Sequence, residues 1–175
     1  MLKIYSLIRL VAISDKLAVS VIKNKMIMSR IVLISCVSRK VGHKAKAKDL
    51  YKGPLFTSSL AFGQSLKPDK IFILSALHHL LDLNKEIEPY NVTLSKIKKN
   101  NIKKELKILT PDEKIEWGKQ VINQLKNEAN ILSDEFIVLA GKEYIKPIES
   151  YISNLKMPLQ GKRVGERIKF MQNQK

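Results

Sequence analysis

Three short apolar runs constrain this chain more than any other feature. They are RIVLISCVS at residues 30–38, KIFILS at 70–75 and EFIVLA at 135–140, and each is rich in β-branched residues. Runs of this kind are typical of strands that are buried on both faces. Helix starts separate them, with Pro54 in one first turn and the capping pattern TPDE at residues 110–113 opening another. Strands that alternate with helices predict an α/β fold, in which helices flank a small, mostly parallel, Rossmann-like sheet.

The length of the chain sets its domain organisation. A chain of 175 residues is suited to one domain, and we expect residues 29–175 to form it. Residues 1–28 are expected to be a poorly ordered extension or a segment upstream of the true start, because Arg9 and Asp15 interrupt the apolar stretch that a secretory signal needs. A final helix is expected from about Lys142 to Leu155.

Composition favours a cytoplasmic protein without a membrane anchor. No apolar run approaches the roughly 18 to 20 residues of a transmembrane helix. Cys36 is the single cysteine of the chain, which excludes an intrachain disulfide and a multi-cysteine metal site and is in keeping with a reducing compartment.

The charge points to an anionic partner. The chain has 32 Lys+Arg against 16 Asp+Glu, a net charge of +16. Such an excess attracts polyanions, with nucleic acid the first candidate and anionic membrane surfaces the second. Nearly all of it is lysine in a chain rich in isoleucine and asparagine, which is also the composition that an AT-rich genome encodes. We therefore predict nucleic acid or a nucleotide as the partner, with compositional bias as the alternative and the oligomeric state open.

Polar residues follow each of the three predicted strands. The carboxyl ends of parallel strands share one edge of a sheet, where α/β proteins bind ligands. We therefore expect a pocket at this edge, and the loop after the second strand supplies Ser75, His78 and Glu88 as candidate catalytic residues. The candidate ligand-binding residues around them are Ser35, Cys36, Lys40, Lys48, Tyr51, Tyr90, Gly141, Lys142 and Tyr144.

Several of these residues have a structural alternative. Pro89 forces Glu88 into an extended conformation that aims its carboxylate, but Glu88 could equally cap a helix or pair with a lysine. Cys36 is either a reactive thiol or a small buried hydrophobe. His78 and His79 cannot both face one pocket, so no metal site is predicted. No cofactor is predicted either, because the chain has no Walker motif and no G-x-G-x-x-G.

Five motifs occur in an order that resembles a family of uncharacterised bacterial and phage domains. They are S-C-x-S-R-K, D-L-Y-x-x-P-L-F, I-L-S-A-x-H-x-L-L-D, E-P-Y-x-x-T-L and L-A-G-K-x-Y, and with the tail they cover about residues 31–170. The resemblance makes Ser75, His78, Glu88 and Tyr90 family motif positions. The family pattern has glycine at the position of His79. This departure implies a different turn in this chain.

That family is similar in turn to the YaaA peroxide-stress proteins. This resemblance implies a YaaA-like core, DNA binding, and protection from peroxide through lower free intracellular iron. The helix-hairpin-helix element of the YaaA proteins is not found in this sequence, so DNA binding here would depend on surface lysines. The pattern C-x-x-x-K from Cys36 to Lys40 is also similar to the lyase domain of archaeosine synthase, which implies a nucleobase ligand.

Two hypotheses of function follow. In the first, the pocket binds or processes a nucleobase: Lys40, Lys46 and Lys48 neutralise phosphate, Ser75 and His78 hydrogen-bond the ligand, and Glu88 is a general base or an acceptor. In the second, the chain is a non-catalytic DNA-binding or oxidative-stress protein. Whether it is an enzyme stays open.

Overall fold

The three apolar runs become three adjacent strands. The computed structural model describes residues 28–97 and 105–174, and within them β1 (Arg30–Ser35), β3 (Lys70–Ser75) and β8 (Glu135–Leu139) pair in parallel with β1 in the middle. The predictions made for residues 1–27, and the lysines at positions 98, 99, 103 and 104, lie outside the described residues.

Two edge strands complete a five-stranded sheet in the order β4-β3-β1-β8-β9. β9 (Leu155–Lys156) runs parallel to β8, whereas β4 (His79–Asp82) runs antiparallel to β3. The α/β class with flanking helices is thus confirmed, and the sheet is mixed. β4 takes the place of the expected loop because the chain reverses directly after Ser75 and buries Leu81 against the sheet.

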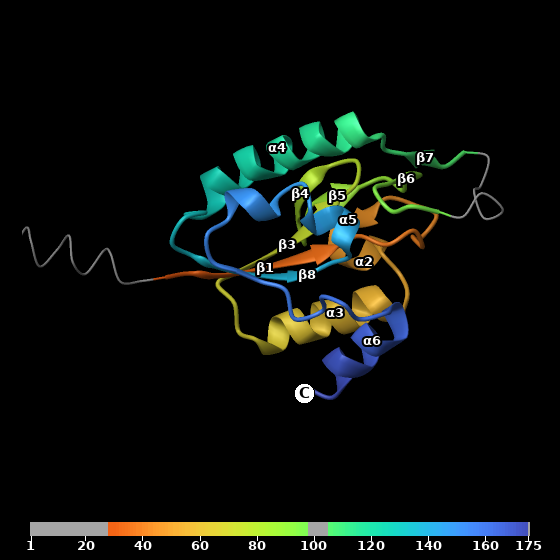
Figure 1. The fold of residues 1–175 in the computed structure, drawn as a ribbon. Helices are drawn as coiled ribbons and strands as arrows, with labels where there is room; N and C mark the ends of the chain where they lie inside the picture. Colours follow the sequence, from red (N-terminus) through yellow and green to blue (C-terminus); the bar gives the residue numbers. More distant parts are fainter. Residues whose placement is uncertain (1–27, 98–104, 175) are drawn as a thin grey trace, which may run out of the picture.

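Helices cover both faces of the sheet (Figure 1). α4 (Pro111–Glu128) lies on one face, and its predicted start is confirmed because Thr110 and Glu113 form a reciprocal capping box. α3 (Pro54–Ser65) lies on the other face beside α6 (Val164–Gln172), where the rings of Phe62 and Phe170 meet edge to face with centroids 6.0 Å apart.

Short elements lie mostly at the carboxyl edge, and the turn η2 lies toward the amino edge (Figure 1). β2 pairs antiparallel with β5, and β6 pairs parallel with β7. These remaining elements are β2 (Ala45–Lys46), α2 (Ala47–Leu50), β5 (Glu86–Ile87), β6 (Val92–Thr93), β7 (Lys107–Ile108), α5 (Lys142–Ile145) and the 3-10 turn η2 (Glu149–Tyr151).

The long helix expected over residues 142–155 is wrong. α5 ends at Ile145, and the chain continues through η2 into β9. Pro147 supplies the reason, because a proline inside a helix lacks an N–H donor and its ring clashes with the preceding turn. The segment that leaves the helical path becomes the fifth strand of the sheet.

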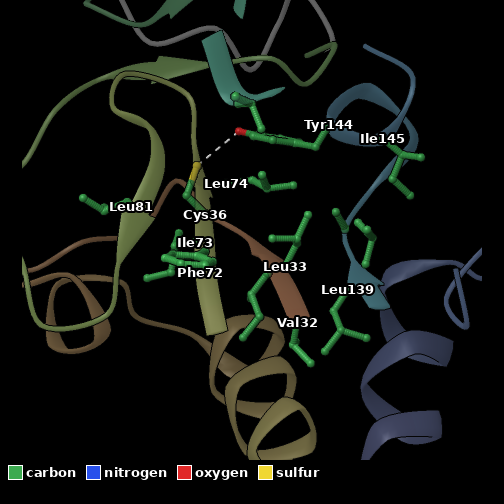
Figure 2. Close-up of a cluster of buried hydrophobic side chains, with 14 of the residues drawn as sticks. Val32, Leu33, Cys36, Phe72, Ile73, Leu74, Leu81, Leu139, Tyr144 and Ile145 are labelled. Carbon is green, nitrogen blue, oxygen red and sulfur yellow. Dashed lines mark hydrogen bonds between the residues drawn. The ribbon is translucent and has the colours of Figure 1, made fainter. Parts of the chain in front are cut away.

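The core is built around β1, whose residues Ile31 to Ile34 are at most 1% exposed. Figure 2 shows Val32 and Leu33 among the buried side chains of the neighbouring strands. Burial of each such side chain contributes about 1.5–3 kcal/mol. In the described part of the chain, no helix is long and apolar enough to cross a membrane.

The connections from the central strands diverge at the carboxyl edge. From β1 the chain crosses to β3 through α3, on one face of the sheet. From β8 it passes to β9 by way of Pro147, which lies against Gly118 of α4 on the opposite face. The direction of winding therefore reverses between β1 and β8, and such a point is where α/β sheets open a crevice for ligands.

Replacing Gly118 by alanine is expected to lower the free energy of unfolding by about 1–3 kcal/mol, although alanine is the better helix former. A Cβ at position 118 would lie 2.4 Å from the carbonyl oxygen of Pro147 and 2.7 Å from its Cβ. Chemical denaturation measures the change.

The control for this substitution is Gly165→Ala in α6, where an added Cβ has no neighbour within 4 Å. This control is expected to raise the free energy of unfolding by up to about 1 kcal/mol. A Gly118→Ala protein as stable as the wild type would contradict the close contact between α4 and Pro147.

Candidate ligand site at the carboxyl edge of the sheet

Residues after β1 and β8 meet at the point where the winding reverses. The Sγ atom of Cys36 and the hydroxyl of Tyr144 form a buried hydrogen bond of 3.2 Å (Figure 2). The indole ring of Trp117 packs edge to face on Tyr144, with centroids 5.7 Å apart. The contacts with Cys36 and Trp117 hold the Tyr144 side chain in place. The Cys36 thiol is buried beside it.

Three hydroxyl groups form a second hydrogen-bonded chain beside this pair. The hydroxyl of Tyr90 lies 2.8 Å from that of Tyr51 and 2.8 Å from the Oγ of Ser75. Ser75 is fully buried, and its Oγ also accepts a hydrogen bond from the backbone N–H of His78 at 3.0 Å. Ser75 therefore positions the turn and the Tyr90 ring, and its hydroxyl is already engaged within the protein.

The tyrosines of this site stay protonated at neutral pH. Burial raises the pKa of Tyr51, Tyr90 and Tyr144 above the ordinary value, and the charge interaction with Cys36 acts in the same direction. Their hydroxyls are consequently neutral hydrogen-bonding groups rather than bases.

Lys40 supplies a cation to the site. Its Nζ atom lies 4.1 Å from the centroid of the Tyr90 ring and 5.6 Å from that of Tyr51, within the range of a cation–π contact. The ammonium also donates to the carbonyl oxygen of Val37 at 3.2 Å. Among the described residues, no carboxylate forms an ion pair with Lys40.

The surroundings of Lys40 disfavour its charged form. Burial lowers the pKa of Lys40 below the ordinary value, and the charge interaction with Cys36 opposes this shift. A desolvated ammonium without a carboxylate is a group that an anionic ligand can stabilise.

His78 is a further neighbour of the Tyr90 ring. The two rings meet edge to face with centroids 5.4 Å apart, and the Nε2 atom of His78 is buried without a hydrogen-bond partner among the described residues. Burial lowers the pKa of His78, and the nearby Lys85 and His79 lower it further. The ring is accordingly neutral at pH 7.

His79 completes the turn in a conformation that glycine adopts more easily. Its φ is +61°, in the left-handed region where a Cβ is strained. The strand pair of Ser75 with His79 is nevertheless formed. The turn is thus built with histidine at a position that favours glycine.

The other predicted residues are more scattered. Glu88 is exposed and forms no side-chain hydrogen bond or ion pair with the described residues. Ser35 and Lys48 are partly buried, and Lys142 is exposed. Gly141 is the residue before α5. The edge therefore brings Lys40, Tyr51, Ser75, His78 and Tyr90 into one contact network and leaves Glu88 outside it. Trp117 connects the pair of Cys36 and Tyr144 to this network.

Two residues at this edge were not predicted from the sequence. The Nε1 atom of Trp117 donates to the carbonyl oxygen of Ser75 at 2.8 Å, and a guanidinium nitrogen of Arg167 lies 3.3 Å from the position of a Cβ on Gly141. Trp117 is the single tryptophan of the chain. Its place in an amphipathic helix predicts that it is buried in the core, but not that it contacts Ser75. Arg167 falls in the tail covered by the family resemblance, but nothing local places it near β8.

A hollow of about 370 Å³ lies at the opposite edge of the sheet, near the start of β3 and the end of α4. Its charged groups are already engaged with one another or with backbone: Lys70 pairs with Glu128, and Asp69 accepts from the N–H of Arg30. The described residues contain no cluster of three or more potential metal ligands at either edge. The carboxyl edge is thus the better candidate site.

Comparison with known proteins gives one match. A family model described as a family of unknown function (DUF6884) matches residues 31–173. No curated protein and no solved structure matches the chain. The match agrees with the predicted family of uncharacterised domains, whereas the likeness to the YaaA proteins stays a prediction.

Replacing His79 by glycine is expected to raise the free energy of unfolding by about 1 kcal/mol, because the left-handed conformation is strained for a residue with a Cβ. Thermal or chemical denaturation provides the measurement. His79→Ala is the matched comparison, since it removes the imidazole and keeps the Cβ. If the alanine variant is as stable as the glycine variant, backbone strain at position 79 is not the cause.

Proposed function

We propose that this chain, which belongs to the DUF6884 family of unknown function, binds a nucleotide-like anion at the carboxyl edge of its sheet. The observation that supports this proposal is the Lys40 ammonium, partly buried over the Tyr90 ring without a carboxylate partner among the described residues. In this proposal Lys40 neutralises the phosphate of the ligand.

An anion explains why Lys40 is placed here. Burial of an ammonium without a counterion is unfavourable, and the Tyr90 face together with the Val37 carbonyl offsets this only in part. A phosphate oxygen would replace the lost hydration with a charge-assisted hydrogen bond, worth about 1.5–3 kcal/mol. Hydrogen bonds within the chain of Ser75, Tyr90 and Tyr51 use two of its three hydroxyl protons, so one hydroxyl of the chain can donate to the same oxygens.

A nucleotide is favoured over a simple anion by the walls of the site. Tyr90 and His78, which are both partly exposed, combine ring surfaces with polar atoms, which suits a ligand that has both a planar ring and a charged group. The net charge of +16 would steer such an anion toward the protein. The similarity of C-x-x-x-K to a lyase domain that acts on a modified nucleobase points in the same direction.

The proposed function is binding and includes no catalytic step. Glu88 would have to approach the ligand from its exposed position, two residues before Tyr90, before it could act as a general base. Ser75 is a positioning residue in the described contacts, and His78 is a neighbour of the same Tyr90 ring as Lys40.

The second candidate function is electrostatic DNA binding without chemistry, and the distribution of charge favours it. At the amino edge of the sheet, Arg30 and Lys156 pair with Glu135, and Lys70 pairs with Glu128. At the carboxyl edge, Lys44, Lys107 and Lys114 form ion pairs, whereas Lys46, Lys48 and Lys52 form none among the described residues. A polyanion could contact these last three lysines. A YaaA-like oxidative-stress role is part of this second candidate and has the sequence resemblance as its support.

Replacing Lys40 by methionine is expected to reduce the affinity for nucleoside monophosphates by at least about tenfold, because methionine keeps the apolar stem but cannot neutralise phosphate. The free energy of unfolding without ligand is expected to stay unchanged or rise slightly, since a desolvated cation is removed. Calorimetric titration with AMP, GMP, CMP and UMP measures affinity. Lys52→Met, an exposed lysine of the same segment, is the control. Equal affinity in the Lys40 variant, or no binding by the wild type, would contradict the proposal.

DNA binding by the second candidate is expected to weaken steeply with salt, with a slope of about 0.9 per neutralised phosphate. Lys46→Glu with Lys52→Glu should lower the affinity for any duplex sequence, while Lys40→Met should leave it nearly unchanged. Fluorescence anisotropy between about 50 and 200 mM salt gives the slope. Lys126→Glu combined with Lys67→Glu, two exposed lysines at the opposite end of the molecule, is the charge-matched control. No retention of DNA at the lowest salt removes this candidate.

A further inference from the structure

We infer that His78 recognises the ring of the ligand, with its Nε2 atom hydrogen-bonded to a heteroatom on the edge of a nucleobase while Lys40 holds the phosphate. This inference rests on the proposed nucleotide-binding function and goes further by naming the ligand class: a nucleoside monophosphate, free or at the end of a nucleic-acid strand.

The first observation is the Nε2 atom itself. Buried side-chain nitrogen and oxygen atoms in folded proteins nearly always have hydrogen-bond partners, and an exception calls for an explanation. Among the described residues, the Nε2 of His78 is the one buried side-chain polar atom without a partner. Ser59, Ser75 and Asp134, which are the buried polar residues, all have partners.

The second observation is how firmly the His78 turn is held. The backbone N–H of His78 donates to the Oγ of Ser75 at 3.0 Å, and the carbonyl oxygen of the same Ser75 accepts from the indole of Trp117 at 2.8 Å. The Tyr90 ring then packs against the imidazole. These contacts fix the position of the imidazole, as a recognition group requires.

The third observation is the strain in the next residue. His79 has a φ of +61°, and non-glycine residues in this region are concentrated at functional sites, where the surrounding structure holds them. The turn therefore combines a strained residue with an unsatisfied ring nitrogen, and both features are adjacent in the chain.

The chemistry of the ring selects the kind of ligand group. His78 is neutral at pH 7, because burial and the nearby Lys85 lower its pKa, so Nε2 either donates or accepts one hydrogen bond according to the tautomer. A nucleobase edge offers both N–H donors and N or O acceptors in one plane. Phosphate and sugar have no such planar edge.

His78 and Lys40 are neighbours of the same aromatic ring. Both residues contact the same Tyr90 ring, with the Lys40 Nζ at 4.1 Å and the His78 centroid at 5.4 Å from its centre. A ligand that spans from Lys40 to His78 along Tyr90 would place a charged group at one end and a planar ring at the other.

Ribose 5-phosphate separates the two roles, because it carries the phosphate of a nucleotide and lacks the base. The His78→Phe and His78→Gln variants are titrated with AMP, GMP, CMP and UMP and with ribose 5-phosphate. We expect His78→Phe to reduce the affinity for the tightest-binding nucleotide by about tenfold, the effect of one lost hydrogen bond. The affinity for ribose 5-phosphate is expected to stay within about twofold of the wild-type value. Lys40→Met is expected to reduce the affinity for the nucleotide and for ribose 5-phosphate.

The wild-type protein provides a readout that needs no substitution. The ring ¹⁵N resonances of His78 should shift on titration with the bound nucleotide and stay in place with ribose 5-phosphate. If a nucleotide binds through Lys40 while these resonances stay fixed and His78→Phe binds equally well, the inference is wrong and the proposed function stands. If no nucleotide binds the wild type, both are wrong. A short single-stranded oligonucleotide with a terminal phosphate tells whether the strand end binds more tightly than the free nucleotide.

Discussion

The parallel pairing of β1 with β3 on one side and β8 on the other is the constraint on which the rest of the structure depends. Five residue pairs join β1 to each neighbour, and the side chains from Ile31 to Ile34 are almost completely buried. Such a strand can satisfy its backbone only between two others, and its side chains only between two helical layers. Once it is fixed, the ends of three strands must meet at one edge.

That edge is arranged around Ser75, the last residue of β3. Its carbonyl oxygen holds Trp117 of α4, and its hydroxyl holds Tyr90 and the backbone of His78. The apolar packing of the core therefore sets the positions of the polar groups above it. Two groups at this edge are exceptions: Lys40 lies over Tyr90 without a carboxylate partner in the described residues, and the buried Nε2 of His78 has no hydrogen-bond partner there. This edge therefore carries an uncompensated cation on a rigid support, whereas the nearby Lys44 and Lys114 are neutralised by ion pairs.

Much of the fold could be predicted from the sequence because its signals are local. The bounds of β3 are those of the apolar run, and the capping box of α4 is visible in four consecutive residues. The predictions failed where long-range contacts decide. The hairpin after Ser75 forms although its fourth position holds His79 at a positive φ, and β9 forms because the chain beyond Pro147 finds the free edge of β8. Of the candidate residues, Glu88 was favoured by a local conformational argument, yet it lies outside the contact network.

The sequence by itself determined the three central strands, the starts of α3 and α4 and the edge at which polar residues would gather, because these depend on hydrophobic pattern, β-branching and capping within a few residues. Only the tertiary structure decided which of those residues touch. Tyr51 and Tyr90 are 39 residues apart and share a hydrogen bond, and Cys36 meets Tyr144 across 108 residues. The burial of Lys40 and of the His78 ring nitrogen likewise comes from the packing of distant segments. The electrostatic character of the site is for that reason a property of the folded chain.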